Sequence, residues 1–286
     1  MAGLLAVAVL ALSFAVPNAF GQNALRLPVL LGPVALLLAP RRGVPVLARA
    51  VVLGGLVYLG CLPAIRAVDE AQGDPSTQRA FWAAPRDYLA HATPPGQRVE
   101  VAFTHNHWEA AYLATAVPLA RGWERQLDEK ANPIFYDGRT LTATSYHAWL
   151  RRNAVRFVVL PSAPLDYSAR QEARLIARGL PYLRLARSGR GWRIYAVTDA
   201  EAPASGGARV TASGPDGFDV DAGGPTVVRE RYTRYWQSDG ACLSRAPGGW
   251  TRVTPHHAGP VRVRAHFALD PSGGCRTAPT REANGG

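Results

Sequence analysis

The first 68 residues contain no aspartate or glutamate, and their only charged side chains are five arginines. All 21 acidic residues and the other 27 of the 32 basic residues lie in the following 218 residues. Lysine is almost absent, since Lys130 is its only occurrence. The net charge of +11 therefore divides into +5 on an apolar head and +6 on a polar body. Because the arginines of the body are scattered among acids and no recognition module is present, we do not expect nucleic-acid binding.

Several motifs that carry known chemistry are also missing. The chain has no GxSxG, no HExxH, no CxxC and no glycine-rich phosphate loop. A serine hydrolase, a zinc peptidase, a thiol oxidoreductase and a nucleotide-binding fold of the usual kinds are therefore not indicated. No cofactor is predicted.

The uncharged head indicates membrane helices. Apolar runs predict spans over about 2–20, 22–40 and 44–65, so that residues 1–66 form a transmembrane region. Arg41 and Arg42 lie in a short loop between the last two spans and are expected on the cytoplasmic side. Residues after about 66 would then be extracytoplasmic, at the plasma membrane. The alternative is that residues 1–21 are a cleaved signal peptide, and it leaves the body on the same side.

Cysteine is scarce, with three residues in the chain. Cys61 lies within the third apolar run and is expected to be a small apolar residue there. Cys242 and Cys275 are the only two in the body. In an oxidising compartment they are predicted to form a disulfide.

The body shows two periodicities. Residues 75–200 mix strand patterns with helix patterns, which predicts a small α/β domain with a mixed sheet. A linker rich in Ala, Gly and Ser is expected over 201–207, and short strands with a period of two follow over 208–276. They predict an antiparallel β-sandwich, with a disordered tail over 277–286. The expected fold class is thus a membrane-anchored α+β protein.

The sequence HNHWE, at 105–109, is the first candidate site. If the strand before it continued, His105 and His107 would share one face and chelate a metal, with Glu109 as a further ligand or a base. The simpler interpretation is a turn from strand to helix, in which Asn106 or His107 caps the helix and Trp108 packs inward.

The sequence RGWERQLDEK, at 121–130, is the second candidate. Its charged side chains would line a polar rim for a sugar or phosphate, with an aromatic ring as a stacking surface. The residues in question are Arg121, Trp123, Glu124, Arg125, Asp128 and Lys130. The simpler and favoured interpretation is a solvated loop whose ion pairs contribute little to stability. A third pattern, DVD at 219–221, alternates with apolar residues and is expected to lie on the wet face of a strand.

Taken together, the anchor and the strings GWERQLD and LDYSA resemble part of a known group. The chain is similar, over about 18–269, to the C-terminal part of polytopic actinobacterial integral membrane proteins of unassigned activity. Those proteins are distantly similar to GT-C-type glycosyltransferases, which use polyprenyl-phosphate sugars outside the cytoplasm. Relative to them the chain is expected to be N-terminally truncated. The catalytic carboxylate that the resemblance implies in an early outer loop is also missing, because residues 16–25 contain no acid.

Two functional hypotheses follow from the sequence. In the first, the chain is a non-catalytic membrane-tethered module that recognises an envelope glycan or a polyprenyl-linked sugar, together with a helical membrane partner. In the second, His105, His107 and Glu109 form a metal-dependent hydrolytic site. A transporter component is a weaker third alternative.

Overall fold

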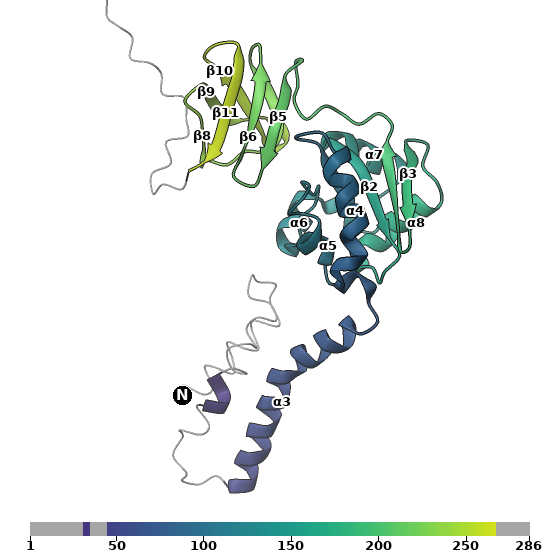
Figure 1. The fold of residues 1–286 in the computed structure, drawn as a ribbon. Helices are drawn as coiled ribbons and strands as arrows, with labels where there is room; N and C mark the ends of the chain where they lie inside the picture. Colours follow the sequence, from purple (N-terminus) through teal and green to yellow (C-terminus); the bar gives the residue numbers. More distant parts are fainter. Residues whose placement is uncertain (1–30, 35–44, 267–286) are drawn as a thin grey trace, which may run out of the picture. The chain divides into compact units, whose positions relative to one another are not determined.

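The structure is a computed structural model that describes residues 31–34 and 45–266 of the chain. The chain divides into two compact units, Met1–Asp74 and Pro75–Gly286. Figure 1 shows their secondary structure. Of the three predicted spans, the first and most of the second lie outside the described residues.

The described part of the first unit is dominated by one long helix, α3, which runs from Val46 to Ala71. It is long and apolar enough to cross a bilayer, and no residue in it is buried. The predicted third span ends at residue 65, but the helix continues past Arg66 to a polar last turn with Asp69 and Glu70. Pro63 lies inside the helix, a position that membrane helices tolerate better than soluble ones.

The second unit begins with an α/β domain built on a four-stranded sheet of order β1-β2-β4-β3. Its strands are β1 (Arg98–Val101), β2 (Val155–Pro161), β3 (Leu183–Gly189) and β4 (Trp192–Val197). Its helices are α4 (Arg79–Ala92), α5 (Trp108–Tyr112), α6 (Arg125–Ala131), α7 (Ala143–Arg152) and α8 (Arg170–Ala177). β1 and β2 are parallel, while β4 is antiparallel to both of its neighbours. The predicted mixed sheet is confirmed.

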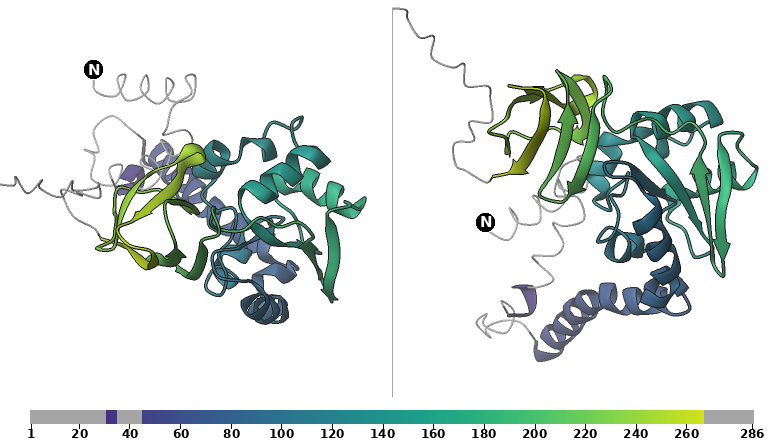
Figure 2. Two further views of the ribbon diagram at one scale, coloured as in Figure 1. Left: turned by 90° about the horizontal axis from the view of Figure 1, so that it is seen from above. Right: turned by 45° about the horizontal axis from the view of Figure 1, so that its top comes forward.

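Helices cover both faces of this sheet (Figures 1 and 2). β2 explains why, because it is apolar on both sides: Val158 and Leu160 belong to a core with α7 and α8. Phe157 and Val159 belong to a second core with α4 and α5. A strand that is buried on both faces reads as a continuous apolar run, which is what VRFVVL shows.

Local sequence accounts for α7. The Thr142 side chain accepts a hydrogen bond from the Ser145 backbone, and the Ser145 side chain accepts one from the Thr142 backbone in return. This reciprocal capping satisfies two donors that a helix start leaves unpaired. The N-cap of α7 is therefore Thr142.

Helix α4 is absent from the sequence-based prediction. Pro85 lies in its interior and is a strong signal against a helix, because proline lacks the N–H that the turn requires. Tertiary packing compensates, since Trp82, Pro85 and Leu89 are all buried along one side of α4.

Two antiparallel sheets follow. One has the order β7-β10-β9 and the other β5-β6-β11-β8. Their strands are β5 (Arg209–Gly214), β6 (Gly217–Ala222), β7 (Thr226–Arg231), β8 (Trp236–Gln237), β9 (Ala241–Arg245), β10 (Trp250–Pro255) and β11 (Gly259–Ala265). Both sheets contribute to one hydrophobic core, Val220 and Val263 from the larger and Val228 and Val253 from the smaller. The predicted period-two strands are present, but β8 and β9 were not predicted.

The segment 201–207, expected to be a linker, is packed between the α/β domain and these sheets. Ala204 is buried in the core of the sheets, and the Ser205 N–H donates to the Val227 carbonyl at 3.0 Å. Gly96, on the side of the α/β domain, has a φ of +76°, and a Cβ there would lie 2.9 Å from Val210. The close approach and the positive φ both require glycine at this position.

Candidate functional site

The HNHWE segment forms a turn, so the strand does not continue through it. β1 ends at Val101, and His107 has a left-handed φ of 55° immediately before α5. The condition on which the chelating pair depends, a strand that continues through His105 and His107, is therefore not met, and the turn interpretation holds. His107 occupies the N-cap position of α5, but its side chain makes no capping hydrogen bond.

Glu109 stabilises this turn. Its carboxylate is buried and accepts hydrogen bonds from the Thr104 N–H at 3.2 Å and the Thr104 hydroxyl at 2.5 Å. His107 Nδ1 lies 3.3 Å from the other carboxylate oxygen, and the His107 ring packs edge-on against Phe103. The Trp108 ring stacks on Tyr112. Glu109 thus satisfies the orphan donors of a tight turn, a structural role that leaves its carboxylate fully occupied.

No metal centre is found among residues 31–34 and 45–266. In that part of the chain, no group of three or more His, Cys, Asp or Glu side chains converges in a way that would hold a metal ion. The DVD pattern lies on a strand, as predicted. Phe218 and Val220 face the core, and the Asp219 carboxylate forms an ion pair with Arg264 at 2.6 Å.

The RGWERQLDEK segment is not a solvated loop throughout. The guanidinium of Arg121 is completely buried, and its Nη2 and Nε lie 2.8 and 3.1 Å from Asp128 Oδ2. Its Cζ lies 3.9 Å from the ring centre of Phe103 and 3.8 Å from that of Phe135. A planar cation held against two aromatic rings is a strong arrangement. Both the rim and the solvated-loop interpretations are wrong for Arg121 and Asp128.

Two further buried carboxyl groups face the same guanidinium, and no local sequence pattern predicts either of them. Arg121 Nη1 lies 3.5 Å from Glu100 Oε1 and 3.6 Å from Glu172 Oε2. The Tyr146 hydroxyl donates to Glu172 at 2.6 Å, and the Tyr136 hydroxyl donates to Asp128 at the same distance. We call Arg121, Glu100, Asp128 and Glu172 the buried ionic cluster.

One cation does not neutralise three carboxylates, and protonation makes up the difference. Burial, followed by the neighbouring Glu172, raises the pKa of Glu100 well above its usual value. Burial also raises the pKa of Glu172, against the opposing effect of Arg121. Both shifts favour the protonated form of these two carboxyl groups, which reduces the cost of buried negative charge. The side chains of the cluster are almost completely closed to solvent, and they join β1, α6 and α8.

Arg125, in the same RGWERQLDEK segment, is partly exposed rather than buried. Arg125 forms a bidentate pair with Asp166, at 3.3 and 2.8 Å, and its Cζ lies 4.7 Å from the ring centre of Tyr167. Burial would raise the pKa of Asp166, but hydrogen bonds from Arg125 and Ser168 outweigh it and hold that pKa at about 2. The Arg125 side chain is thereby fixed in one orientation, as a platform beside the tyrosine.

Exposed large apolar side chains lie close to this platform in the sequence or contact it directly. In the described part of the second unit, four large hydrophobic side chains are more than half exposed: Trp123, Leu127, Tyr167 and Leu185. Trp123 and Leu127 flank Arg125 in the sequence, and Tyr167 lies under its guanidinium. We call Trp123, Arg125, Leu127 and Tyr167 the α6 surface. Glu124 and Lys130 are exposed beside it, and neither makes an ion pair with another described residue.

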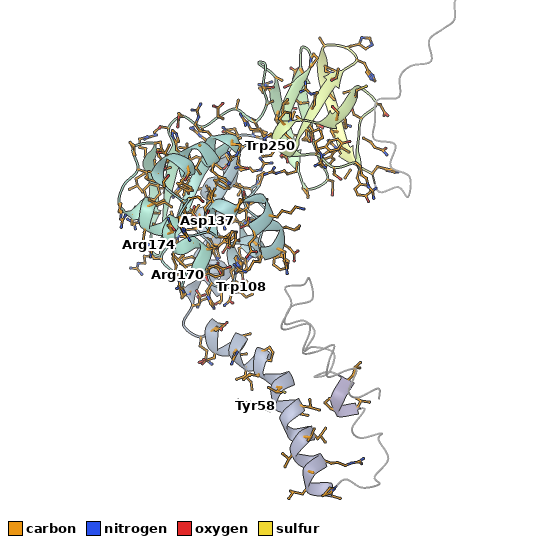
Figure 3. All side chains as sticks on the ribbon, turned by 180° about the vertical axis from the view of Figure 1, so that it is seen from behind. Tyr58, Trp108, Asp137, Arg170, Arg174 and Trp250 are labelled. Atoms are coloured by element: carbon orange, nitrogen blue, oxygen red, sulfur yellow. The ribbon has the colours of Figure 1, made fainter. Side chains whose placement is uncertain are left out.

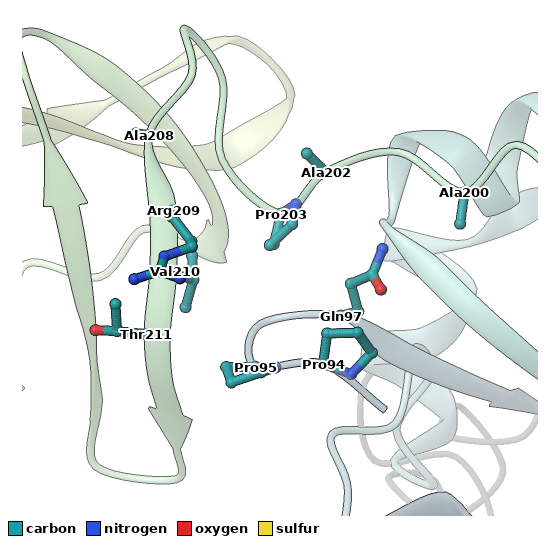
Figure 4. Close-up of a pocket in the computed structure, with 10 residues that line it drawn as sticks. All are labelled: Pro94, Pro95, Gln97, Ala200, Ala202, Pro203, Ala208, Arg209, Val210 and Thr211. Atoms are coloured by element: carbon teal, nitrogen blue, oxygen red, sulfur yellow. The ribbon is translucent and has the colours of Figure 1, made fainter. Parts of the chain in front are cut away.

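A groove of about 630 Å³ lies where the α/β domain meets β5 (Figure 4). Pro94, Pro95 and Gln97 line one side of it, and Arg209, Val210 and Thr211 of β5 line the other. The Gln97 amide donates to the Glu201 carbonyl at 3.1 Å and so is already engaged. The lining is mainly proline and alanine, with Arg209 as its charged member, and it contains no pair of groups for acid–base chemistry.

One half of the predicted Cys242–Cys275 disulfide, Cys275, lies outside the described residues. Cys242 is on β9, with its Sγ 3.9 Å from His256 Nε2. Cys61 is an exposed free cysteine on α3.

No protein-family model, no curated protein and no solved structure matches this chain.

Proposed function

We propose that this chain is a membrane-anchored protein whose body lies outside the cytoplasm and recognises an envelope glycan. The anchor is α3, which at 26 residues extends about 39 Å as a helix. The hydrocarbon core of a bilayer is about 30 Å thick. No residue of this apolar helix is buried by other described residues, and a bilayer would remove its side chains from water.

The direction of insertion follows from charge. Arg41, Arg42 and Arg49 lie at or before the start of α3, while Asp69 and Glu70 lie at its end. Basic residues next to a span favour the cytoplasmic side. We infer that the residues after α3 are extracytoplasmic, where the predicted Cys242–Cys275 disulfide would also be stable.

The α6 surface carries the proposal of glycan recognition. The apolar faces of sugar rings pack on exposed tryptophan and tyrosine, whose rings contribute large area at little entropic cost. Guanidinium donors bind sugar hydroxyls and acidic sugar groups. The pair with Asp166 fixes the orientation of the Arg125 guanidinium. Three of the four most exposed large apolar side chains of the described body lie on α6, two residues before it, or against the Arg125 guanidinium.

We propose no catalysis by this chain alone. The similarity to membrane proteins distantly related to GT-C-type glycosyltransferases fits a role beside envelope glycans, with a helical membrane partner that supplies the transfer site. We also propose that the two antiparallel sheets constitute a β-sandwich domain, since they share a single core.

A printed array of bacterial envelope polysaccharides tests this function. The full-length chain in detergent is expected to bind at least one polysaccharide, and Trp123→Ala and Tyr167→Ala are each expected to weaken that binding about tenfold or more. Leu185→Ala is the matched control, because Leu185 is similarly exposed but lies on β3. The proposal is contradicted if no polysaccharide binds, or if all three variants bind like the unaltered protein.

A further inference from the structure

The outward face of α8 carries a row of three arginines. Arg170, Arg174 and Arg178 lie four residues apart, on the side of the helix opposite the buried Glu172 and Ile176. All three are exposed, and Figure 3 labels the first two. At a rise of about 1.5 Å per residue, the three positions extend about 12 Å along the helix. We call Arg170, Arg174 and Arg178 the α8 row.

Nearby acids do not compensate the charge of the α8 row. Asp166, just before α8, is paired with a residue of α6, and Glu172 belongs to the buried ionic cluster. Asp137 accepts a hydrogen bond from a threonine hydroxyl in its own turn, and residues 173–198 include six arginines but no acid. Like charges four residues apart destabilise a helix, and a cation in its first turn, as at Arg170, is also unfavourable. The start of the row is therefore not explained by helix stability.

A cavity joins the far end of the α8 row to the start of α7. It has a volume of about 660 Å³, and Arg174 and Arg178 line it together with Leu141, Thr142 and Gln171. The Gln171 side-chain amide donates to the Leu141 carbonyl at 2.7 Å and so links the two sides. The two arginines therefore border one space that a ligand lying along α8 can enter.

The α8 row also continues the α6 surface. Tyr167, a member of that surface, begins the 3₁₀ turn Tyr167–Ala169, which ends directly before Arg170. Tyr167 and Arg170 are thus about one helical turn apart. A polymer that packs on Trp123 and Tyr167 can extend from there onto the α8 row.

We propose that the ligand of the α6 surface is an acidic glycan whose carboxylate or phosphate groups bind the α8 row. Guanidinium groups bind such groups through two parallel N–H donors. A row of cations without counter-charges also attracts a polymer that carries repeated negative charges. The inference rests on the proposed glycan recognition and adds the charge class of the glycan.

Biolayer interferometry of the full-length chain in detergent tests the inference with two probes that share one backbone. Polygalacturonate carries a carboxylate on each sugar, whereas its methyl ester is neutral. We expect saturable binding of polygalacturonate, about tenfold or more tighter than that of the ester, and sodium chloride should weaken it. A triple variant with Arg170→Gln, Arg174→Gln and Arg178→Gln should bind polygalacturonate about tenfold or more weakly. Glutamine suits the helix as well as arginine does.

The matched control removes three exposed arginines from the antiparallel sheets, so that both triple variants have the same net charge: Arg209→Gln, Arg245→Gln and Arg252→Gln. Near-ultraviolet circular dichroism verifies that both are folded. The proposal is overturned if polygalacturonate does not bind, or binds no more tightly than its ester. It is equally overturned if the folded α8 row variant binds polygalacturonate as well as the control does.

Trp123→Ala separates a failure of this inference from a failure of the proposed function. Binding of the neutral ester that depends on Trp123 but not on the α8 row would leave glycan recognition in place and overturn the acidic glycan. Absence of binding to either probe and to every polysaccharide on the array would overturn both. Dihexanoyl phosphatidylglycerol is the third probe, and binding of it through the α8 row without binding of polygalacturonate would overturn the proposal in favour of a lipid headgroup.

Discussion

Arg121 and Asp128 form an ion pair that is closed to solvent, with Arg121 Nη2 2.8 Å from Asp128 Oδ2. Both side chains come from a charge-dense stretch that reads as a surface loop, yet each is almost completely buried. The pair fixes the start of α6 against the sheet, because Glu100 and Glu172 approach the same guanidinium from β1 and α8.

Removing the cation from this cluster should strongly destabilise the α/β domain. Arg121→Met keeps much of the side-chain volume but leaves the buried carboxyl groups of the cluster without their only cation. We expect a loss of about 3–5 kcal/mol in the free energy of unfolding, measured by urea unfolding of the full-length chain in detergent. Arg125→Gln is the control, since Arg125 is partly exposed in its pair with Asp166 and should lose about 1 kcal/mol or less. Equal losses for the two variants would contradict the account.

The buried cluster also predicts how stability depends on pH. The pKa of Glu100 is raised in the folded protein, first by burial and then by Glu172, while an unfolded glutamate titrates at about 4.3. Above that pH the folded state holds more protons than the unfolded state, so its stability falls as pH rises. The fall should continue until the pH passes the raised pKa of Glu100. The low pKa of Asp166, about 2, contributes no slope in this range.

Glu100→Gln isolates the effect, because an amide has nearly the same shape as a protonated carboxyl and does not titrate. Urea unfolding between pH 5 and pH 8 should show a smaller decline in stability for this variant than for the unaltered chain. Identical pH profiles would show that Glu100 does not hold the extra proton.

The start of α7 offers a local test of capping. Thr142→Ala removes the acceptor for the Ser145 N–H and should lower the free energy of unfolding by about 1 kcal/mol. Thr144→Ala is the neighbouring control, because Thr144 lies within the exposed first turn and alanine is a better helix former there. Thermal unfolding measures both variants. Equal losses of stability in Thr142→Ala and Thr144→Ala would contradict the predicted cap.

The disulfide is tested by mass spectrometry of the chain digested without reduction. We expect one peptide pair joined through Cys242 and Cys275, with Cys61 as a free thiol. On the chain-entropy estimate the bridge stabilises the folded state by about 3–4 kcal/mol, so Cys242→Ser should lower the melting temperature. Recovery of both thiols in alkylated form would refute the bridge.

Much of the body could be predicted from local patterns. The β3–β4 hairpin, the Thr142 cap and the apolar strand β2 each follow from signals within a few residues. Helix α4 could not be predicted, because the packing of Trp82 and Leu89 outweighs the local effect of Pro85. The strands β8 and β9 are short and lack a clear alternation, and they are defined by pairing with β11 and β10.

Local sequence patterns predict the candidate sites less well than the fold. The interpretation of HNHWE as a turn before a helix is confirmed, but His107 at the N-cap position makes no capping hydrogen bond with its side chain. Glu109 instead binds Thr104 within the turn. The burial of Arg121 depends on Glu100 and Glu172, which lie far from it in the sequence, and no periodicity brings them together. The sequence shows Trp123 close to Arg125 and also contains the string LDYSA, but no local pattern indicates that Asp166 and Tyr167 of that string contact Arg125.

The most direct test of the account is the sidedness of the body. An epitope tag placed after Gly286 in the full-length chain should sediment with membranes and be removed by external protease from intact spheroplasts. A cytoplasmic marker protein should survive the same treatment. A tag that resists the protease until the membrane is lysed, or that stays in the soluble fraction, would contradict the account.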